Sequence, residues 1–115
     1  MKVVIIEDEG FAAMRLKKMI LQYNPDIEIM AELESVKESV LWFKSHNDPD
    51  LIFLDIQLED DLSFSIFEQV NITSPVIFTT AFDEYAIKAF KLKSIDYLLK
   101  PIIQEELVAA LKKYE

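Results

Sequence analysis

The chain has 115 residues, of which 51% are hydrophobic, and this predicts one folded domain with a real core. Its 21 acidic and 12 basic side chains give a net charge of −9, which disfavours binding to nucleic acid or to anionic membranes. Without cysteine and with a single histidine, it has no disulfides, thiolate metal sites or multi-histidine metal sites. No apolar run approaches the roughly 20 residues of a membrane span, and we expect a cytoplasmic protein.

Five short apolar runs, rich in β-branched and aromatic residues, predict five β-strands. Runs of this length and composition are typical of strands that are buried on both faces of a sheet. The predicted strands cover residues 3–6, 27–31, 51–54, 76–79 and 95–99.

Apolar residues at a spacing near 3.6 predict five helices between and after these strands. Ser35 and Glu38 fit a capping box at the start of the second helix. Glu9 is expected to begin the first helix rather than to bind a ligand. The predicted helices cover residues 11–23, 35–44, 62–70 and 83–90, and a last one begins near residue 104.

Strands that alternate with helices imply a parallel sheet covered on both faces. Because crossover connections are right-handed, we expect an α/β, flavodoxin-like (βα)5 three-layer sandwich with a five-stranded parallel sheet of order 2-1-3-4-5. Ligands bind such sheets beyond the carboxyl ends of the strands, where the strand order reverses between strands 1 and 3. Chemistry is therefore expected from the residues at the strand ends.

Three carboxylates are predicted to crowd this edge, because strand 1 ends at Glu7 and Asp8 and strand 3 ends at Asp55. Two such charges about 4 Å apart repel by roughly 4 kcal/mol at an effective dielectric near 20. The cluster must protonate, bind a cation or recruit a base. A few carboxylates suit Mg²⁺, which keeps several waters and shares its sites with phosphate. Lys100 and Thr80, at the ends of strands 5 and 4, offer an ammonium and a hydroxyl.

These groups indicate phosphoryl chemistry. A carboxylate can attack phosphorus, and the central position of Asp55 makes it the expected acceptor, with Glu7 and Asp8 serving the metal. Lys100 and Thr80 would hold the phosphoryl oxygens. The product, an aspartyl phosphate, adds about two negative charges at one point.

Five motifs in this order resemble the receiver domains of two-component response regulators, over essentially the whole chain. The segments 79–86 and 95–101 also resemble receivers attached to LytTR-type DNA-binding domains. The five motifs are residues 7–9, residues 52–58 around Asp55, Thr80–Ala81, Tyr97 and Lys100–Pro101.

The resemblance implies that a sensor histidine kinase donates the phosphoryl group to Asp55. It also implies that Mg²⁺ is held by Asp8, Asp55 and the backbone carbonyl of Gln57, and through water by Glu7. Glu7 departs from the pattern, because Asp is usual there in much of the family. We interpret residues 1–115 as the receiver domain of a protein whose DNA-binding output domain is absent from this chain, so that this domain itself does not bind nucleic acid.

The resemblance further implies a switch. After phosphorylation Thr80 would turn toward the phosphate and Tyr97 would move inward, which reshapes the surface formed by the fourth helix, fifth strand and fifth helix. In the family this surface commonly forms a homodimer or meets the output domain. Gln57 and Phe82 would tune the lifetime of the phosphate, and our hypothesis is that Phe82 shields it from water.

Other functions remain open at this point. Phosphohydrolases with an Asp nucleophile often carry a second Asp two residues on, where this chain has Gln57. A flavin-binding domain would want a Ser-, Thr- or Gly-rich loop after strand 1, whereas residues 7–9 are acidic and repel phosphate. A stand-alone or degenerate receiver used only for protein contacts would not need the acids together with Lys100.

Acidic residues concentrate in one part of the chain. Residues 45–87 hold nine acids and no Lys or Arg. Two interpretations are open for these acids: a solvated acidic rim, and a set of which some members bind a cation.

Overall fold

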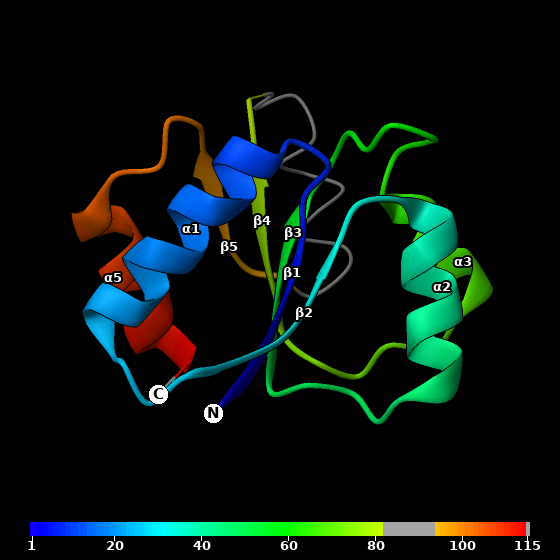
Figure 1. The fold of residues 1–115 in the computed structure, drawn as a ribbon, viewed down its shortest axis with the longest axis horizontal. Coiled ribbons are helices and arrows are strands. Elements are labelled where there is room, and N and C mark those ends of the chain that lie inside the picture. Colours follow the sequence, from blue (N-terminus) through cyan, green and yellow to red (C-terminus); the bar gives the residue numbers. More distant parts are fainter. Residues whose placement is uncertain (82–93, 115) are drawn as a thin grey trace.

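The computed structural model describes residues 1–81 and 94–114 as a five-stranded parallel sheet with helices on both faces (Figure 1). The strand order β2-β1-β3-β4-β5 confirms the predicted order and the flavodoxin-like fold. The fourth helix, predicted over residues 83–90, lies outside the described residues. The strands are β1 (Lys2–Ile6), β2 (Glu28–Leu33), β3 (Leu51–Asp55), β4 (Val76–Thr80) and β5 (Ser94–Leu99), and the helices are α1 (Gly10–Tyr23), α2 (Val36–Ser45), α3 (Phe64–Gln69) and α5 (Gln104–Tyr114).

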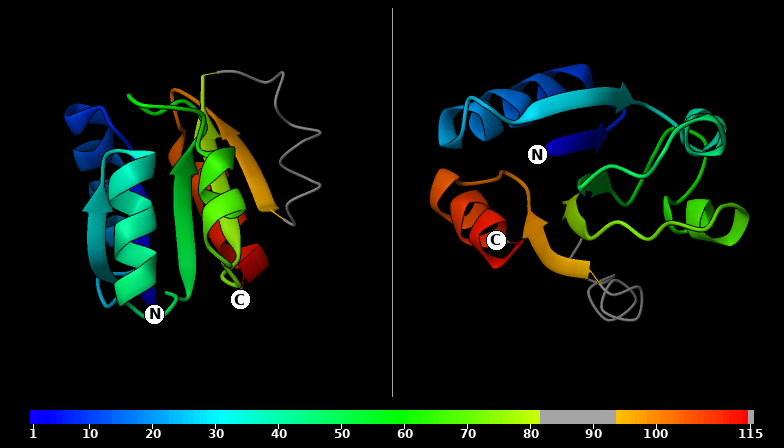
Figure 2. Two further views of the ribbon diagram at one scale, coloured as in Figure 1. Left: turned by 90° about the vertical axis from the view of Figure 1, so that its right-hand side faces the viewer. Right: turned by 90° about the horizontal axis from the view of Figure 1, so that it is seen from below.

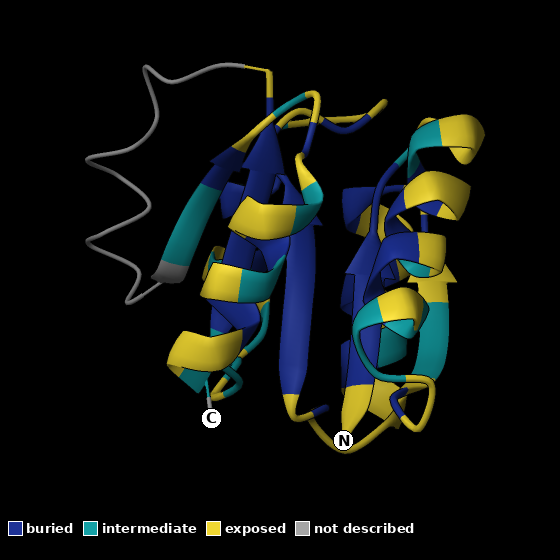
Figure 3. Cartoon of the chain, turned by 90° about the vertical axis from the view of Figure 1, so that its left-hand side faces the viewer, coloured by how far each residue is buried: buried dark blue, intermediate teal, exposed yellow. Residues whose placement is uncertain are grey.

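Two helical layers cover the sheet. Helices α1 and α5 lie on one face, and α2 and α3 lie on the other (Figures 1 and 2). Because successive side chains of a strand point to opposite faces, Val3 and Ile5 pack toward α1 and α5, while Val4 and Ile6 pack toward α2 and α3. β3 and β4 are buried along their whole length, and β1 is buried beyond its first residue (Figure 3). Because these strands are buried on both faces, their sequences are continuous apolar runs.

Two elements differ from their predicted bounds by more than one residue at an end. β2 begins after Ile27, whose N–H group donates to the carbonyl of Asn24 in the turn after α1. β2 then extends to Leu33 because it follows β1 as far as Ile6. α3 begins at Phe64 rather than at residue 62, since Leu62 pairs with Gln57 across the preceding loop.

The helix starts are capped by carboxylates as well as by serine. Glu9 caps α1, as predicted, by accepting hydrogen bonds from the N–H groups of Phe11 and Ala12. At α2, Ser35 Oγ accepts from the N–H of Glu38 at 3.0 Å, which is the Ser35 half of the predicted capping box.

Asp60, from the loop between β3 and α3, completes the cap of α2. Its Oδ1 and Oδ2 accept from the N–H groups of Val36 at 2.9 Å and Lys37 at 3.0 Å. Burial alone would raise the pKa of Asp60, but these two donors favour the charged carboxylate and hold its pKa below the usual value.

Other acids of the segment 45–87 also stabilise loops. Asp48 accepts hydrogen bonds from the backbone N–H and the hydroxyl of Thr73, at 2.8 and 2.7 Å. Asp50 accepts from the N–H of Lys2 at 2.7 Å. These acids therefore bind donors of the protein itself, a role that neither the rim nor the cation interpretation included.

One buried hydroxyl near the start of α3 has no such partner. Ser63 is fully buried, and its Oγ makes no hydrogen bond to any described residue. Burying an unsatisfied hydroxyl costs about 1–3 kcal/mol. We predict that Ser63→Ala raises the free energy of unfolding by about 1 kcal/mol, because it removes that cost and keeps the packing. Urea denaturation followed by the fluorescence of Trp42 measures the change.

Ser74→Ala is the matched control, because Ser74 Oγ donates to the carbonyl of Pro49 at 2.6 Å. The loss of this hydrogen bond should lower the free energy of unfolding by about 1 kcal/mol. A Ser63→Ala variant that is destabilised as much as Ser74→Ala would contradict the prediction.

Candidate functional site

The carboxyl ends of β1, β3 and β5 bring four charged side chains to one edge of the sheet. Glu7 and Asp8 directly follow β1, Asp55 ends β3, and Lys100 directly follows β5. The order of the strands creates this cluster, because β1 and β3 are hydrogen-bonded neighbours although their residues lie about fifty positions apart in the chain. Their ends appear at the top of the sheet in Figure 1.

Three carboxylates lie within direct reach of one another. Glu7, Asp8 and Asp55 each offer one oxygen, and these oxygens all lie within 4.8 Å of one another. Glu7 is 4% exposed and Asp55 is 6% exposed, while Asp8 is half-buried. Such a concentration of buried negative charge requires compensation.

Lys100 supplies that compensation. Its Nζ donates to Asp55 Oδ2 at 3.0 Å and forms a second ion pair with Glu7 Oε1. The structure therefore shows the base that the sequence led us to expect at this edge. Burial alone would lower the pKa of Lys100, but its hydrogen bond to Glu7 and the charge of Asp55 raise the pKa above its usual value. Lys100 is thus a fixed positive charge at neutral pH.

Asp8 is the least compensated of the acids. Burial raises its pKa, and the hydrogen bond to Glu7 and the charge of Glu7 raise it further, while its own backbone N–H and the more distant Lys100 only partly oppose this. A divalent cation bound by these carboxylates would relieve the repulsion between Asp8 and Glu7. The donor set consists of hard carboxylate oxygens, which fits Mg²⁺ and not a soft transition metal.

Gln57 is exposed two residues beyond Asp55 and pairs with Leu62 across a short loop. Two hydrogen bonds flank this pair, from Ser63 N–H to the carbonyl of Ile56 and from Leu58 N–H to the carbonyl of Asp61. In an antiparallel pair flanked in this way, the N–H and C=O groups of the paired residues point away from the ladder. The carbonyl of Gln57 is therefore oriented out of its loop.

The two predicted switch residues lie on the α2 and α3 side of the sheet. Thr80 ends β4, is fully buried and follows Phe78 on the side of α2 and α3, and its carbonyl accepts from the N–H of Lys100 at 2.8 Å. Tyr97 is half-buried, and its ring centroid lies 6.4 Å from that of Phe78. Phe82, predicted to tune the phosphate lifetime, lies outside the described residues.

A cleft of about 280 Å³ opens beside Lys100, between the start of α1 and the loop that leads into α5. Phe11 lies at its border and is 69% exposed. Sequence reasoning missed Arg15, whose Nη2 donates to the carbonyl of Ile102 at 2.9 Å and so ties this loop to α1. The cleft is lined by Glu7, Glu9, Phe11, Ala12, Arg15, Leu16, Thr79, Lys100, Pro101 and Ile102.

A flavodoxin-like sheet with three carboxylates and a lysine at its carboxyl edge places the chain among small α/β domains with an acidic cluster at that edge. Comparison with known proteins makes this specific, because the profile of the response regulator receiver domain matches residues 3–112. The chain belongs to this family, which confirms the family identified from the motifs.

The relatives include LytT proteins, in agreement with the LytTR-like segments. The chain is 39% identical to the sensory transduction protein LytT of Bacillus anthracis over all of its own length and 47% of the relative. It is 40% identical to the transcriptional regulatory protein BtsR of Escherichia coli K12, over 97% of this chain and 47% of the relative. It thus spans about half the length of these curated relatives.

Solved structures show the same fold. The response regulatory domain of protein mrkE from Klebsiella pneumoniae superposes with a TM-score of 0.86 at 33% identity, and the match covers 99% of this chain and 94% of that one.

Within the described part of the chain, no helix is both long and apolar enough to cross a membrane.

We predict that Lys100→Met lowers the free energy of unfolding at neutral pH by about 2 kcal/mol, because it leaves the buried charges of Glu7 and Asp55 without their partner. Lys17→Met is the control, since Lys17 forms a solvent-exposed pair with Glu32 at 3.6 Å. This control should cost less than about 0.5 kcal/mol. Chemical denaturation in metal-free buffer measures both, and equal losses would show that the site is not held together by Lys100.

Proposed function

We propose that this chain is a signalling receiver that accepts a phosphoryl group on Asp55 from a sensor histidine kinase, in a reaction that depends on Mg²⁺. The observation that carries the proposal is the meeting of three carboxylates within 4.8 Å, with Lys100 donating to Asp55 and Glu7. Membership of the receiver family supports it. The domain is a switch that labels itself and loses the label slowly, rather than an enzyme with turnover.

Asp8, Asp55 and the outward-facing carbonyl of Gln57 would hold Mg²⁺, with Glu7 acting through water. The bound cation would neutralise charge on the incoming phosphoryl group. An oxygen of Asp55 attacks phosphorus, the bond from phosphorus to the donor histidine nitrogen breaks, and its electron pair stays on that nitrogen. Lys100, held protonated beside Asp55, is placed to bind a phosphoryl oxygen.

The phosphoryl group would then act through Thr80 and Tyr97. An aspartyl phosphate adds about two negative charges and new acceptor oxygens. The Thr80 hydroxyl turns toward them, and the half-buried Tyr97 moves inward beside Phe78. The surface of the fourth helix, β5 and α5 changes as a result, and it would form a homodimer or control an output domain. Gln57 and Phe82 would set how long the phosphate lasts.

The output is proposed to be transcriptional. This chain spans about half the length of its curated relatives, and one of these is the transcriptional regulatory protein BtsR. We propose that residues 1–115 are the receiver domain, that a domain following it binds DNA, and that the receiver itself, with a net charge of −9, does not. The kinase and the receiver would meet in the cytoplasm.

Labelling with acetyl phosphate tests the acceptor. We expect one phosphate per chain in the presence of Mg²⁺, detected by intact mass, and none in Asp55→Asn, because the amide is a poor nucleophile. Glu59→Gln removes an exposed charge from the loop that follows Asp55 and should be labelled normally. Release of many phosphates per chain would favour a phosphohydrolase, and labelling of Asp55→Asn would exclude Asp55 as the acceptor.

The apolar border of the cleft supports a protein donor rather than a small one. Phe11 is 69% exposed beside the cleft that Lys100 lines, and apolar side chains of this kind anchor protein partners. We predict that Phe11→Ala slows phosphotransfer from a histidine kinase that labels the wild-type chain by about tenfold, the effect of losing about 1.4 kcal/mol of contact. Labelling by acetyl phosphate should stay unchanged.

Leu41→Ala is the matched control for this measurement, because Leu41 is 60% exposed on α2, across the sheet from α1. Transfer rates come from gel autoradiography of the labelled kinase mixed with each variant. If Phe11→Ala slows labelling by acetyl phosphate as well as by the kinase, or if Leu41→Ala slows transfer from the kinase equally, Phe11 does not contact the kinase.

A further inference from the structure

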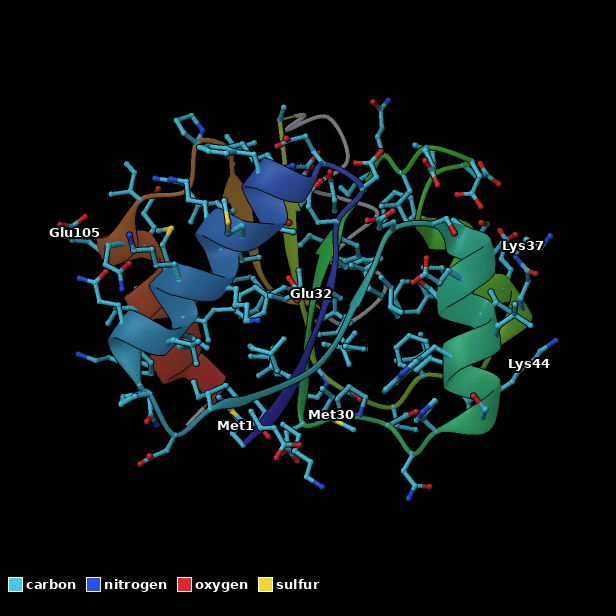
Figure 4. The ribbon with its side chains drawn as sticks, in the orientation of Figure 1. Met1, Met30, Glu32, Lys37, Lys44 and Glu105 are labelled. Atoms are coloured by element: carbon cyan, nitrogen blue, oxygen red, sulfur yellow. The ribbon has the colours of Figure 1, made fainter. Side chains whose placement is uncertain are left out.

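The loop from Ile56 to Ser63 joins the proposed metal site to α2. It begins directly after Asp55 and carries Gln57 near its start. Asp60 lies at the tip of this loop. Its two carboxylate oxygens accept hydrogen bonds from the N–H groups of Val36, at 2.9 Å, and Lys37, at 3.0 Å. Figure 1 shows this loop, between β3 and α3, reaching over the first turn of α2, and Figure 4 labels Lys37 at that end.

The segment between Gln57 and Asp60 is held at both of its ends. At its base, Ser63 N–H donates to the carbonyl of Ile56 at 2.7 Å. Leu58 N–H donates to the carbonyl of Asp61 at 3.0 Å. At its tip, the only hydrogen bonds to another element among the described residues are the two of Asp60, while Leu58 is buried in the core on the side of α2 and α3. Removing Asp60 therefore takes away every hydrogen bond between the tip and α2, and leaves the two-bond ladder and the burial of Leu58 to orient the carbonyl of Gln57.

We propose that Asp60 is a positioning residue, which fixes the Gln57 carbonyl for Mg²⁺ by tying the loop to α2. The inference rests on the proposed function, because it takes Gln57 as a ligand. Mg²⁺ demands near-ideal octahedral geometry, and a backbone ligand on a free loop meets that demand only at a cost in entropy. Asp60 acts without touching the ion, since it is not among the carboxylates that gather at the site.

A role for Asp60 as a helix cap alone would predict a different result, and the chain offers a control that separates the two. Ser35 caps the same first turn of α2 through the N–H of Glu38 but belongs to the segment between β2 and α2. Ser35→Ala and Asp60→Ala should both weaken the start of α2. Only Asp60→Ala should weaken the binding of Mg²⁺.

The charge of Asp60 is a second alternative explanation, because any nearby carboxylate attracts a cation. Glu59→Ala removes the same charge from the neighbouring position in the loop, where the side chain is exposed. Asp60→Asn removes the charge but keeps an oxygen that can accept one of the two N–H groups. It also preserves more of the cap, so it is expected to fold where Asp60→Ala does not.

The experiment is a titration of each full chain with MgCl₂, followed by ¹H–¹⁵N correlation spectra, which also report on the fold. Asp60→Ala is expected to raise the Kd for Mg²⁺ about tenfold, the low end of what outer-shell partners of a ligand cost. Ser35→Ala and Glu59→Ala should change the Kd less than about twofold. The Kd of Asp60→Asn should lie between those of these two controls and that of Asp60→Ala.

The outcomes separate this inference from the proposed function. If the wild-type chain shows no response to Mg²⁺, the proposed function fails. If the wild-type chain binds Mg²⁺ and Asp60→Ala matches Ser35→Ala, Asp60 is a cap only and the inference is overturned. If Asp60→Ala and Glu59→Ala lose affinity equally, charge alone explains the effect and the inference is also overturned.

Discussion

The compensation of buried negative charge by Lys100 is the interaction on which the rest of the site depends. Glu7 and Asp55 are almost fully buried at adjacent strand ends, with Asp8 beside them. The fold brings Lys100 back to both carboxylates and compensates part of their charge, and the order 2-1-3-4-5 does this by placing β4 and β5 beyond β3. In the same arrangement, burial and the neighbouring Glu7 raise the pKa of Asp8.

Much of the site could be predicted because strand ends follow directly from the apolar runs. Once the strands were placed, the topology rules fixed which ends meet, and Glu7, Asp8, Asp55 and Lys100 lie together as expected. The contacts of Asp60 were not predicted, because they join a loop to a helix start 23 and 24 residues away, and no periodicity marks such a pair.

The acidic segment shows why composition alone is ambiguous. Nine acids without an intervening base suggested a rim or a cation site, yet the described members serve several purposes. Asp48 and Asp50 fix loops at the far end of the sheet from Asp55, through backbone and hydroxyl donors. A carboxylate that accepts backbone N–H groups is as well satisfied as one that binds a metal, and only the coordinates distinguish them.

The alternation of β4 suggests how the site and the output surface are connected. Thr79 faces the cleft beside Lys100, while the next residue, Thr80, lies on the other face with Phe78 and Tyr97. The backbone of Thr80 is in turn bonded to that of Lys100. A change at Asp55 therefore has a short covalent and hydrogen-bonded route across the sheet, from the face of α1 to that of Tyr97. Because the core on both sides is close-packed, a small shift of this strand end favours a discrete rearrangement of Tyr97 over a gradual one.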